Sequence, residues 1–234
     1  MRLKLIFKLK ERKIPLDYRR LFLSFMKNAL IKYDERIFKN YYNNNDPILK
    51  DYTFSLYFGR CNFKDSVILE NNIISLFFST YSYKTGVYFY NAFQNIKYYE
   101  YPLKDNSMIL KQIIKLNEKS GLRNEIIVKT MSPIIIRNHT KEIDEYFYFD
   151  EKNASDILKR NIIYQYERIF NEKNKDIEIK VLDLKKITVL NYQKKLKANL
   201  GIFKLIGDAK ILNFLYKTGI GSKKSSGFGM VKII

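Results

Sequence analysis

The chain has 234 residues, enough for one large domain or two small ones, and its 46% hydrophobic and 29% charged residues are typical of a globular protein. No apolar run approaches the roughly 20 residues of a membrane span, and the N-terminus lacks the unbroken apolar stretch of a signal peptide. One cysteine, Cys61, excludes an internal disulfide, and one histidine, His139, excludes a multi-histidine metal site. We therefore expect a cytoplasmic protein that needs no metal ion or cofactor and contacts no membrane.

The balance of charge points to a polyanionic partner. Lysine and arginine number 43 against 24 aspartates and glutamates, so the formal net charge is +19. A domain this basic is a candidate for binding nucleic acid first and an anionic membrane surface second. An AT-rich genome would also raise lysine on any surface, so charge alone leaves that explanation open. Many of the 19 tyrosines and 17 phenylalanines are expected in the core, and some can stack on bases.

The first half of the chain opens with a clear strand and a clear helix. Residues 2–10 alternate apolar and basic side chains, and the segment from Asp17 to about Ile31 repeats apolar residues at helical spacing. Residues 38–51 show no clear period and contain a turn-rich loop at 43–47. Further elements follow: strands at 52–58, 66–70, 73–80, 97–101 and 107–115, and a helix at 84–95.

A second unit of similar pattern starts near Gly121. Residues 124–139 read as a strand broken at Ser132-Pro133, and 145–150 as the return strand of a hairpin. The remaining elements are a helix at 154–171, strands at 176–184 and 197–207, a short helix at 208–217 and a closing strand. The order of elements predicts an α+β fold of two tandem ferredoxin-like (βαββαβ) domains, residues 1–120 and 121–234. RNA-recognition modules use this shape, but so do domains that bind no RNA, so the fold alone does not decide the function.

The C-terminal segment TGIGSKKSSGFGMVKII holds four of the nine glycines and fits neither a P-loop nor a dinucleotide-binding fingerprint. It resembles the C-terminal glycine-rich loop of the RAMP proteins, and most of all that of the CRISPR-associated endoribonucleases of the Cas family six. YTFSLYF (52–58), VKTMSPIII (128–136) and the first helix resemble other parts of that family in the same order. The resemblance covers the whole chain and implies tandem ferredoxin-like domains with a glycine-rich loop at 218–229.

The resemblance makes this loop a candidate RNA-binding element. Glycines let backbone N–H groups approach a phosphate, lysines add charge and serines add hydroxyl donors. The expected RNA-binding residues of the loop are Gly219, Gly221, Lys223, Lys224, Ser225, Ser226, Gly227 and Gly229. Outside the loop, the resemblance points to Arg123, Lys129 and Arg137, which are also ordinary surface cations. The alternative is a glycine-rich turn needed only for tight packing.

The family cleaves RNA without a metal ion, by attack of the 2′-hydroxyl on the adjacent phosphate. Many members use a histidine before the YTFS-like strand, assisted by a tyrosine of the first helix and a lysine. Here the histidine slot falls on about Asn44, the tyrosine slot holds Lys27 and the lysine slot keeps Lys50. The resemblance therefore leads us to expect that Lys27 and Lys50 flank the scissile phosphate, with a hydrogen bond from Tyr41, Tyr42 or Asn44. Neighbouring cations lower the pKa of a lysine, so a fraction of such a lysine can act as a base.

Three functions remain open from the sequence. The first is a metal-independent endoribonuclease that acts on CRISPR repeat RNA, as a monomer or homodimer. The second is a catalytically inactive protein of the same fold that only holds repeat or guide RNA, which the missing histidine favours. The third is a structural subunit of a CRISPR effector complex, because backbone proteins of those complexes share the glycine loop.

Overall fold

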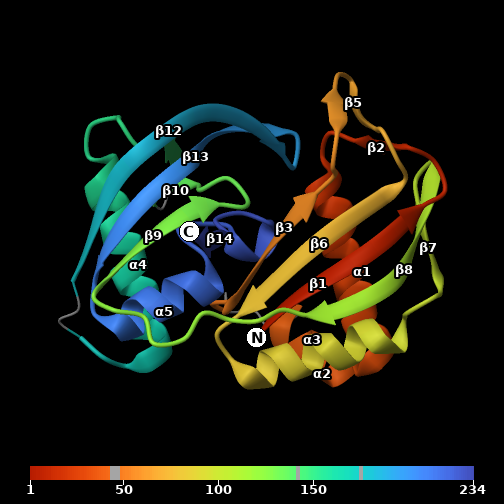
Figure 1. The fold of residues 1–234 in the computed structure, drawn as a ribbon, viewed down its shortest axis with the longest axis horizontal. Coiled ribbons are helices and arrows are strands. Elements are labelled where there is room, and N and C mark those ends of the chain that lie inside the picture. Colours follow the sequence, from red (N-terminus) through yellow and green to blue (C-terminus); the bar gives the residue numbers. More distant parts are fainter. Residues whose placement is uncertain (43–47, 141–142, 174–175) are drawn as a thin grey trace.

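The structure, a computed structural model, describes residues 1–42, 48–140, 143–173 and 176–234. Two main sheets lie side by side, one built by each half of the chain (Figure 1). Within the described residues, every pairing between named strands is antiparallel.

The first half follows the predicted βαββαβ order. Its elements are β1 (Arg2–Leu9), α1 (Tyr18–Tyr33), β3 (Tyr52–Tyr57), β6 (Ile73–Thr80), α3 (Tyr83–Asn95), β7 (Glu100–Leu103) and β8 (Asn106–Lys115). The sheet order is β3-β6-β1-β8-β7, so the two strands in the middle of the βαββαβ core are the first and third, as in a ferredoxin-like domain. Leu3, Leu5 and Phe7 of β1 are fully buried, which explains the alternation in the sequence.

The first half also contains four short elements, β2 (Lys13–Pro15), α2 (Glu35–Tyr42), β4 (Cys61–Phe63) and β5 (Ser66–Leu69). Strand β5 was predicted, and the other three were missed. The prediction that residues 38–51 lack regular structure is wrong for α2. The apolar residues Ile37, Phe38, Tyr41 and Tyr42 recur at helical spacing and pack against the first core, but eight residues are fewer than the window in which a helical period is recognised. Its N-terminal signal was present, because Asp34 accepts a hydrogen bond from the Arg36 N–H at 2.8 Å.

The second half repeats the pattern. Its main elements are β9 (Glu125–Thr130), α4 (Ala154–Phe170), β12 (Ile177–Asn191), β13 (Lys194–Gly207), α5 (Ala209–Thr218) and β14 (Val231–Ile233), in the sheet order β12-β13-β9-β14. The predicted break at Ser132-Pro133 falls between β9 and β10 (Ile136–His139), and β10 pairs with β11 (Asp144–Phe147). Strands β12 and β13 form one long hairpin, with a turn of only two residues. The sequence analysis predicts strands at 176–184 and 197–207, with about twelve residues of loop between them, so this loop is wrong.

Each sheet has its own hydrophobic core. Phe22, Phe78 and Phe89 lie in the first, and Phe203 and Phe214 in the second. The predicted α+β fold of tandem ferredoxin-like units is confirmed. The division near residue 120 stays a prediction, and the two cores fall on either side of it. No helix in the described part of the chain is long and apolar enough to cross a membrane.

Candidate functional site

The glycine-rich loop joins α5 to β14 and is closed by backbone hydrogen bonds. The Ile220 N–H donates to the Gly229 carbonyl, the Ser222 N–H to the Ile135 carbonyl and the Gly229 N–H to the Pro133 carbonyl, each at 2.8 Å. These bonds attach both arms of the loop to each other and to the segment between β9 and β10. Several N–H groups that could have faced a phosphate are thus already used inside the protein.

The four glycines of the loop are buried and have φ between +71° and +88°, a region that glycine adopts without steric penalty. A Cβ atom on Gly229 would lie 2.0 Å from the Ile220 carbonyl oxygen, and one on Gly221 would lie 2.5 Å from the Ile135 carbonyl oxygen. On Gly227 it would lie 2.8 Å from the Phe54 ring. The structure therefore gives Gly219, Gly221, Gly227 and Gly229 a packing role, and the expectation that they face RNA does not fit their burial.

The same loop fastens the two halves of the chain together. Thr53 on β3 donates its hydroxyl to the Phe228 carbonyl at 2.8 Å. Arg19 on α1 is buried, donates Nε to the Gly227 carbonyl at 3.3 Å and stacks on the Phe228 ring at 4.6 Å. A buried arginine that donates to a glycine-loop carbonyl is a structural residue that the sequence analysis missed, since nothing in the helix pattern singles it out.

Lys224 is the clearest departure from the predicted site. Its side chain is only 6% exposed, and Nζ donates to the Thr218 hydroxyl at 3.1 Å and lies 5.0 Å from the centre of the Phe214 ring. Burial lowers the pKa of Lys224 from 10.5 to about 7, and the charge of Asp51 offsets only part of this effect. The ammonium group points into the protein, so the expectation that Lys224 offers charge to RNA is at odds with the structure.

Replacing Lys224 with methionine is expected to stabilise the protein. The folded state holds this lysine with a pKa of about 7, whereas the unfolded chain holds it near 10.5. Between these values the unfolded state binds more protons, so the stability rises with pH from about 7 to 10.5, and below 7 the full penalty remains. Lys224→Met should raise the free energy of unfolding by about 1–4 kcal/mol at pH 7, as buried charges replaced by apolar groups often do. Thermal melts from pH 6 to 10 measure this, and a gain that does not shrink as the pH rises would contradict the assignment.

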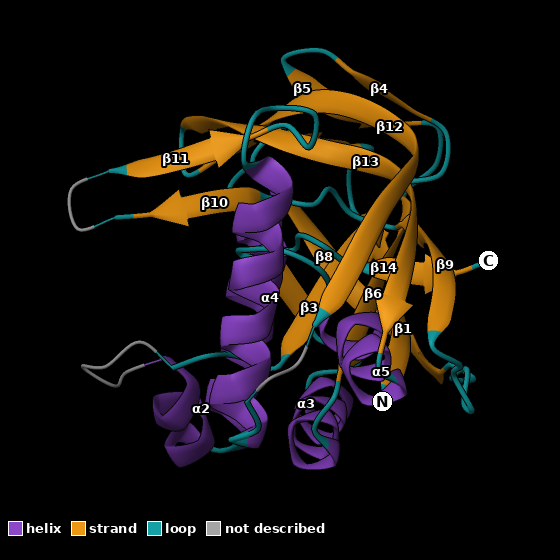
Figure 2. Cartoon of the chain, turned by 90° about the vertical axis from the view of Figure 1, so that its left-hand side faces the viewer, coloured by secondary structure: helices purple, strands orange, loops and turns teal. Residues whose placement is uncertain are grey.

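The exposed part of the loop continues onto the β10–β11 hairpin, which projects beside α4 in Figure 2. Lys223, Ser225 and Ser226 are half-buried. Burial is the main cause that lowers the pKa of Lys223, followed by the nearby charge of Arg137. Arg137 in turn pairs with Asp144 at 3.3 Å. Two of the predicted RNA-binding cations thus lie together at one end of the loop.

Arg123 and Lys129 occupy a different place. Lys129 is exposed on β9, where it pairs with Ile202 of β13 on one side and with Lys232 of β14 on the other. Arg123 is exposed just before β9. Within the described residues neither forms an ion pair or hydrogen bond with the group around Lys223. The structure does not bring the eleven predicted RNA-binding residues into one patch.

The predicted catalytic residues come together at the end of α2. Lys27 on α1 and Lys50, just before β3, place Nζ 4.7 Å and 4.8 Å from the centre of the Tyr42 ring. A cation over an aromatic face is attracted to it, so the ring holds both ammonium groups near each other. Burial and the charge of Lys27 lower the pKa of Lys50. Asn44, the position of the family's histidine, lies outside the described residues.

Tyr42 is itself held by a buried partner. Its hydroxyl and that of Tyr52 on β3 form a short hydrogen bond, and burial raises the pKa of Tyr42 well above its usual value. The neighbouring Tyr41 hydroxyl contacts the Thr85 hydroxyl at 2.7 Å, and burial raises its pKa to about 12. Both phenols therefore stay neutral at ordinary pH and orient the end of α2, and neither serves as a base.

Asp51 fixes the segment that carries Lys50. Its carboxylate accepts hydrogen bonds from the Thr80 hydroxyl, the Ser82 N–H and the Thr85 hydroxyl at 3.0–3.1 Å. Sequence reasoning missed this residue, although Ser82, which caps α3, was a readable signal at one end of the network. Asp51 thus positions Lys50 through the backbone next to it.

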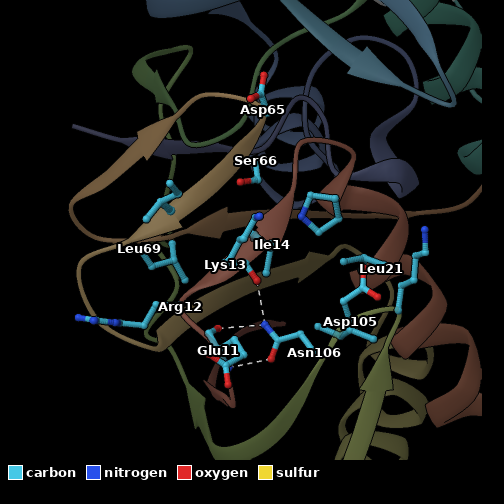
Figure 3. A pocket seen from close by; sticks show the side chains of 14 residues that line it. Glu11, Arg12, Lys13, Ile14, Leu21, Asp65, Ser66, Leu69, Asp105 and Asn106 are labelled. Atoms are coloured by element: carbon cyan, nitrogen blue, oxygen red, sulfur yellow. Dashed lines mark hydrogen bonds between the residues drawn. The ribbon is translucent and has the colours of Figure 1, made fainter.

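Two hollows on the surface have sizes that could hold a ligand. One, of about 920 Å³, lies between the halves and is lined by Tyr18 and Phe54 on one side and by Lys185 and Val189 of the long hairpin on the other. The other, of about 830 Å³, lies in the first half between β2, β5 and the β7–β8 turn (Figure 3). In Figure 3, Asn106 ties the backbone of Glu11 and Lys13 across this second hollow. Its rim mixes three cations with three carboxylates, so it has no preference for a polyanion.

The fold and the loop define a class of protein. The chain shares its two ferredoxin-like units with solved structures. A solved structure titled "Characterization of a Cas6-related gene from Pyrococcus furiosus" has a TM-score of 0.86 at 22% identity, over 100% of this chain and 98% of that one. Another, titled "An RAMP protein binding different RNA substrates", has a TM-score of 0.83 at 22% identity, over 100% and 99%. At these identities the likeness shows the fold.

The family follows from the sequence itself. The family model for "CRISPR associated protein Cas6, C-terminal" matches residues 116–233, which is half of the chain, and the protein belongs to the Cas6 family. A "Putative CRISPR-associated endoribonuclease-like protein Cas6" of Pyrococcus furiosus is 28% identical over 141 residues, 58% of each chain. "CRISPR-associated endoribonuclease Cas6 1" of Methanocaldococcus jannaschii is 31% identical over 112 residues, 45% of this chain and 44% of that one. The matched region thus spans less than two thirds of the length of these curated relatives.

Proposed function

We propose that the protein is an endoribonuclease that binds CRISPR repeat RNA in precursor CRISPR RNA and cleaves it without a metal ion. The observation that carries the proposal is the pair of lysines, Lys27 and Lys50, held on the Tyr42 ring beside β3. Membership of the Cas6 family and the net charge of +19 support an RNA substrate. The names of the relatives, which speak of an endoribonuclease or an endoribonuclease-like protein, support the same reaction.

The proposed reaction is attack of the 2′-oxygen on the adjacent phosphorus. Lys50, whose pKa is lowered, takes the proton of the 2′-hydroxyl in its neutral form. The bond from the 2′-oxygen to phosphorus forms, the bond to the 5′-oxygen breaks, and the charged Lys27 stabilises the added negative charge and donates a proton to the leaving oxygen. The products are a 2′,3′-cyclic phosphate and a 5′-hydroxyl. Tyr42 positions both lysines, and Asn44 stays a candidate hydrogen-bond donor.

The proposed RNA contacts are the cations and hydroxyls that reach the surface near the loop. They are Arg137, Lys223, Ser225 and Ser226, with Arg123 and Lys129 as a separate region on β9. Phosphate contacts of this kind release counterions, so binding should weaken steeply with salt. The buried Lys224 and the four loop glycines support this surface from inside and are not proposed as contacts.

A cleavage assay in EDTA tests the function directly. End-labelled repeat RNA from the same genome should be cut once in the presence of EDTA, and a 2′-deoxy substitution at the cut should abolish the product, because the nucleophile is then absent. Product ends can be read by their mobility with and without phosphatase treatment. Loss of cleavage in EDTA would contradict the metal-independent mechanism, and cleavage of the deoxy substrate would contradict the 2′-hydroxyl attack.

The alternative is a protein that holds repeat or guide RNA without cutting it, alone or as a subunit of a CRISPR effector complex. The position of the histidine favours it. His139 lies at the end of β10, is 68% exposed and contacts Asp144 at 2.7 Å, whereas Lys27, Lys50 and Tyr42 lie in the other half. Tight, salt-sensitive binding of the repeat RNA with no cut in the assay above identifies this alternative. Sedimentation with and without RNA distinguishes a monomer, a homodimer and a filament.

A further inference from the structure

The tip of the long β12–β13 hairpin is an unusual turn. Asn191 pairs with Lys194, which leaves Tyr192 and Gln193 as a two-residue turn. Both have positive φ, +50° and +62°, as a type I′ turn requires. Such turns strongly prefer Asn-Gly, since other side chains disfavour the left-handed region. Residues in such strained conformations cluster at functional sites, so the aromatic residue in this turn is a candidate for a functional role.

The turn reaches across to the first half of the chain. The Arg20 guanidinium on α1 lies 5.0 Å from the centre of the Tyr192 ring. The Tyr192 backbone lies beside the Asp17 carboxylate, which pairs with Arg20 at 3.4 Å. On the two sides of the turn, Leu190 and Lys195 line the cleft between the halves. Tyr192 therefore stands at the mouth of this cleft, with Arg20 beneath it.

The same residue is near the candidate catalytic lysines. Tyr192 is among the neighbours that raise the pKa of Tyr42, so the two side chains lie near each other. Arg20 and Lys27 lie seven positions, or about two turns, apart on one face of α1, which separates them by roughly 10 Å along the helix. Arg20, Tyr192, Lys27 and Lys50 thus follow one another along one surface.

The chemistry of this surface fits a base next to a phosphate. The Tyr192 side chain is 50% exposed, so part of the ring is open to solvent beside the guanidinium. Bases of single-stranded RNA stack on tyrosine rings, and a nearby arginine adds a cation–π contact or a phosphate contact. The geometry points to Tyr192 and Arg20 as a stacking subsite for the nucleobase of a nucleotide that neighbours the scissile phosphate. This inference rests on the proposed function and adds a base contact that phosphate-binding lysines do not supply.

The experiment replaces the turn with one that folds better. The double variant Y192N/Q193G has the preferred Asn-Gly turn, so the hairpin should remain and the thermal midpoint should stay equal or rise. Its affinity for the repeat RNA, measured by fluorescence anisotropy, should fall about tenfold or more with the loss of one stacked base. Tyr192→Phe should keep wild-type affinity. Tyr164→Asn, which removes a tyrosine of similar exposure (59%) from α4, should leave affinity unchanged.

A series of repeat RNAs with one abasic nucleotide each identifies the base. One position near the cut should weaken binding to the wild-type protein and to Tyr192→Phe, but not to the Y192N/Q193G variant. Wild-type affinity in that variant, or an abasic penalty that is the same in both proteins at every position, would overturn the stacking subsite. If the wild-type protein itself does not bind the repeat RNA, the proposed function is wrong and the inference is overturned with it.

Discussion

Gly229→Ala is expected to destabilise the protein by roughly 2–5 kcal/mol, the sum of left-handed backbone strain and an overpacked contact. The added methyl carbon would lie 2.0 Å from the Ile220 carbonyl oxygen. This oxygen belongs to the backbone, so it cannot move away without displacing the chain on either side of it. Since the Gly229 N–H and carbonyl both close the loop, the change also disturbs the hydrogen bonds to Pro133 and Ile220. A loss of this size is a third or more of the stability of many domains. The midpoint of urea unfolding measures it.

Gly59→Ala is the matched control. Gly59 also has a positive φ, +66°, but a Cβ atom there would meet nothing within 4 Å. Only the left-handed backbone strain remains, so we expect the free energy of unfolding to fall by about 1–2 kcal/mol. Equal losses at the two positions would show that backbone conformation alone explains the glycines, and that close packing of the loop adds nothing.

The packing role of the loop changes how its glycines relate to function. The loop holds Phe228 against Arg19 and Thr53, and these residues come from the helix and the strand on either side of the lysine pair. The loop can therefore affect the proposed cleavage by fixing the relative position of α1 and β3 without touching RNA. If the proposed function holds, a glycine variant that still folds is expected to lose activity for this reason.

The strongly periodic elements of the fold were predictable from the sequence. The buried side chains of β1 alternate along the strand, and those of α1 recur at helical spacing. Each pattern can be read within its own segment, without knowledge of the partner that covers it. The hairpin turn at Tyr192-Gln193 was missed because it lacks the Asn-Gly signal of its turn type. Helix α2 was missed because its eight residues are too few to show a sustained period.

The candidate site was predictable only in part. The family resemblance selected both Lys27 and Lys50, but it does not reveal that the Tyr42 ring contacts both of them. The loop prediction was weaker, because sequence cannot tell whether a lysine such as Lys224 faces water or a buried threonine. That distinction depends on α5 and β3, which come from opposite halves of the chain. Residues that act through tertiary contacts, such as Asp51 and Arg19, left no local pattern.

Lys50→Ala is expected to lower the single-turnover rate of cleavage about 100-fold or more, the usual contribution of a general base, and to change RNA affinity little. Lys27→Ala should have a similar effect on the rate, because it removes the charge that stabilises the phosphorane. Lys32→Ala is the matched control, since Lys32 is an exposed lysine of the same helix, and it should keep the wild-type rate. Wild-type rates in both Lys27→Ala and Lys50→Ala would remove the pair from the chemistry.

The pH dependence tests Lys50 as the base. Because Lys50 acts in its neutral form, the rate should rise as the pH passes through the pKa of Lys50, which burial and the charge of Lys27 hold below its ordinary value. Lys27→Met removes that charge and keeps the length of the side chain. The remaining activity should then rise at a higher pH than in the wild-type protein, because the pKa of Lys50 moves back toward its ordinary value. A rise at the same pH in both proteins would show that the rate does not follow the protonation of Lys50, and it would exclude Lys50 as the base.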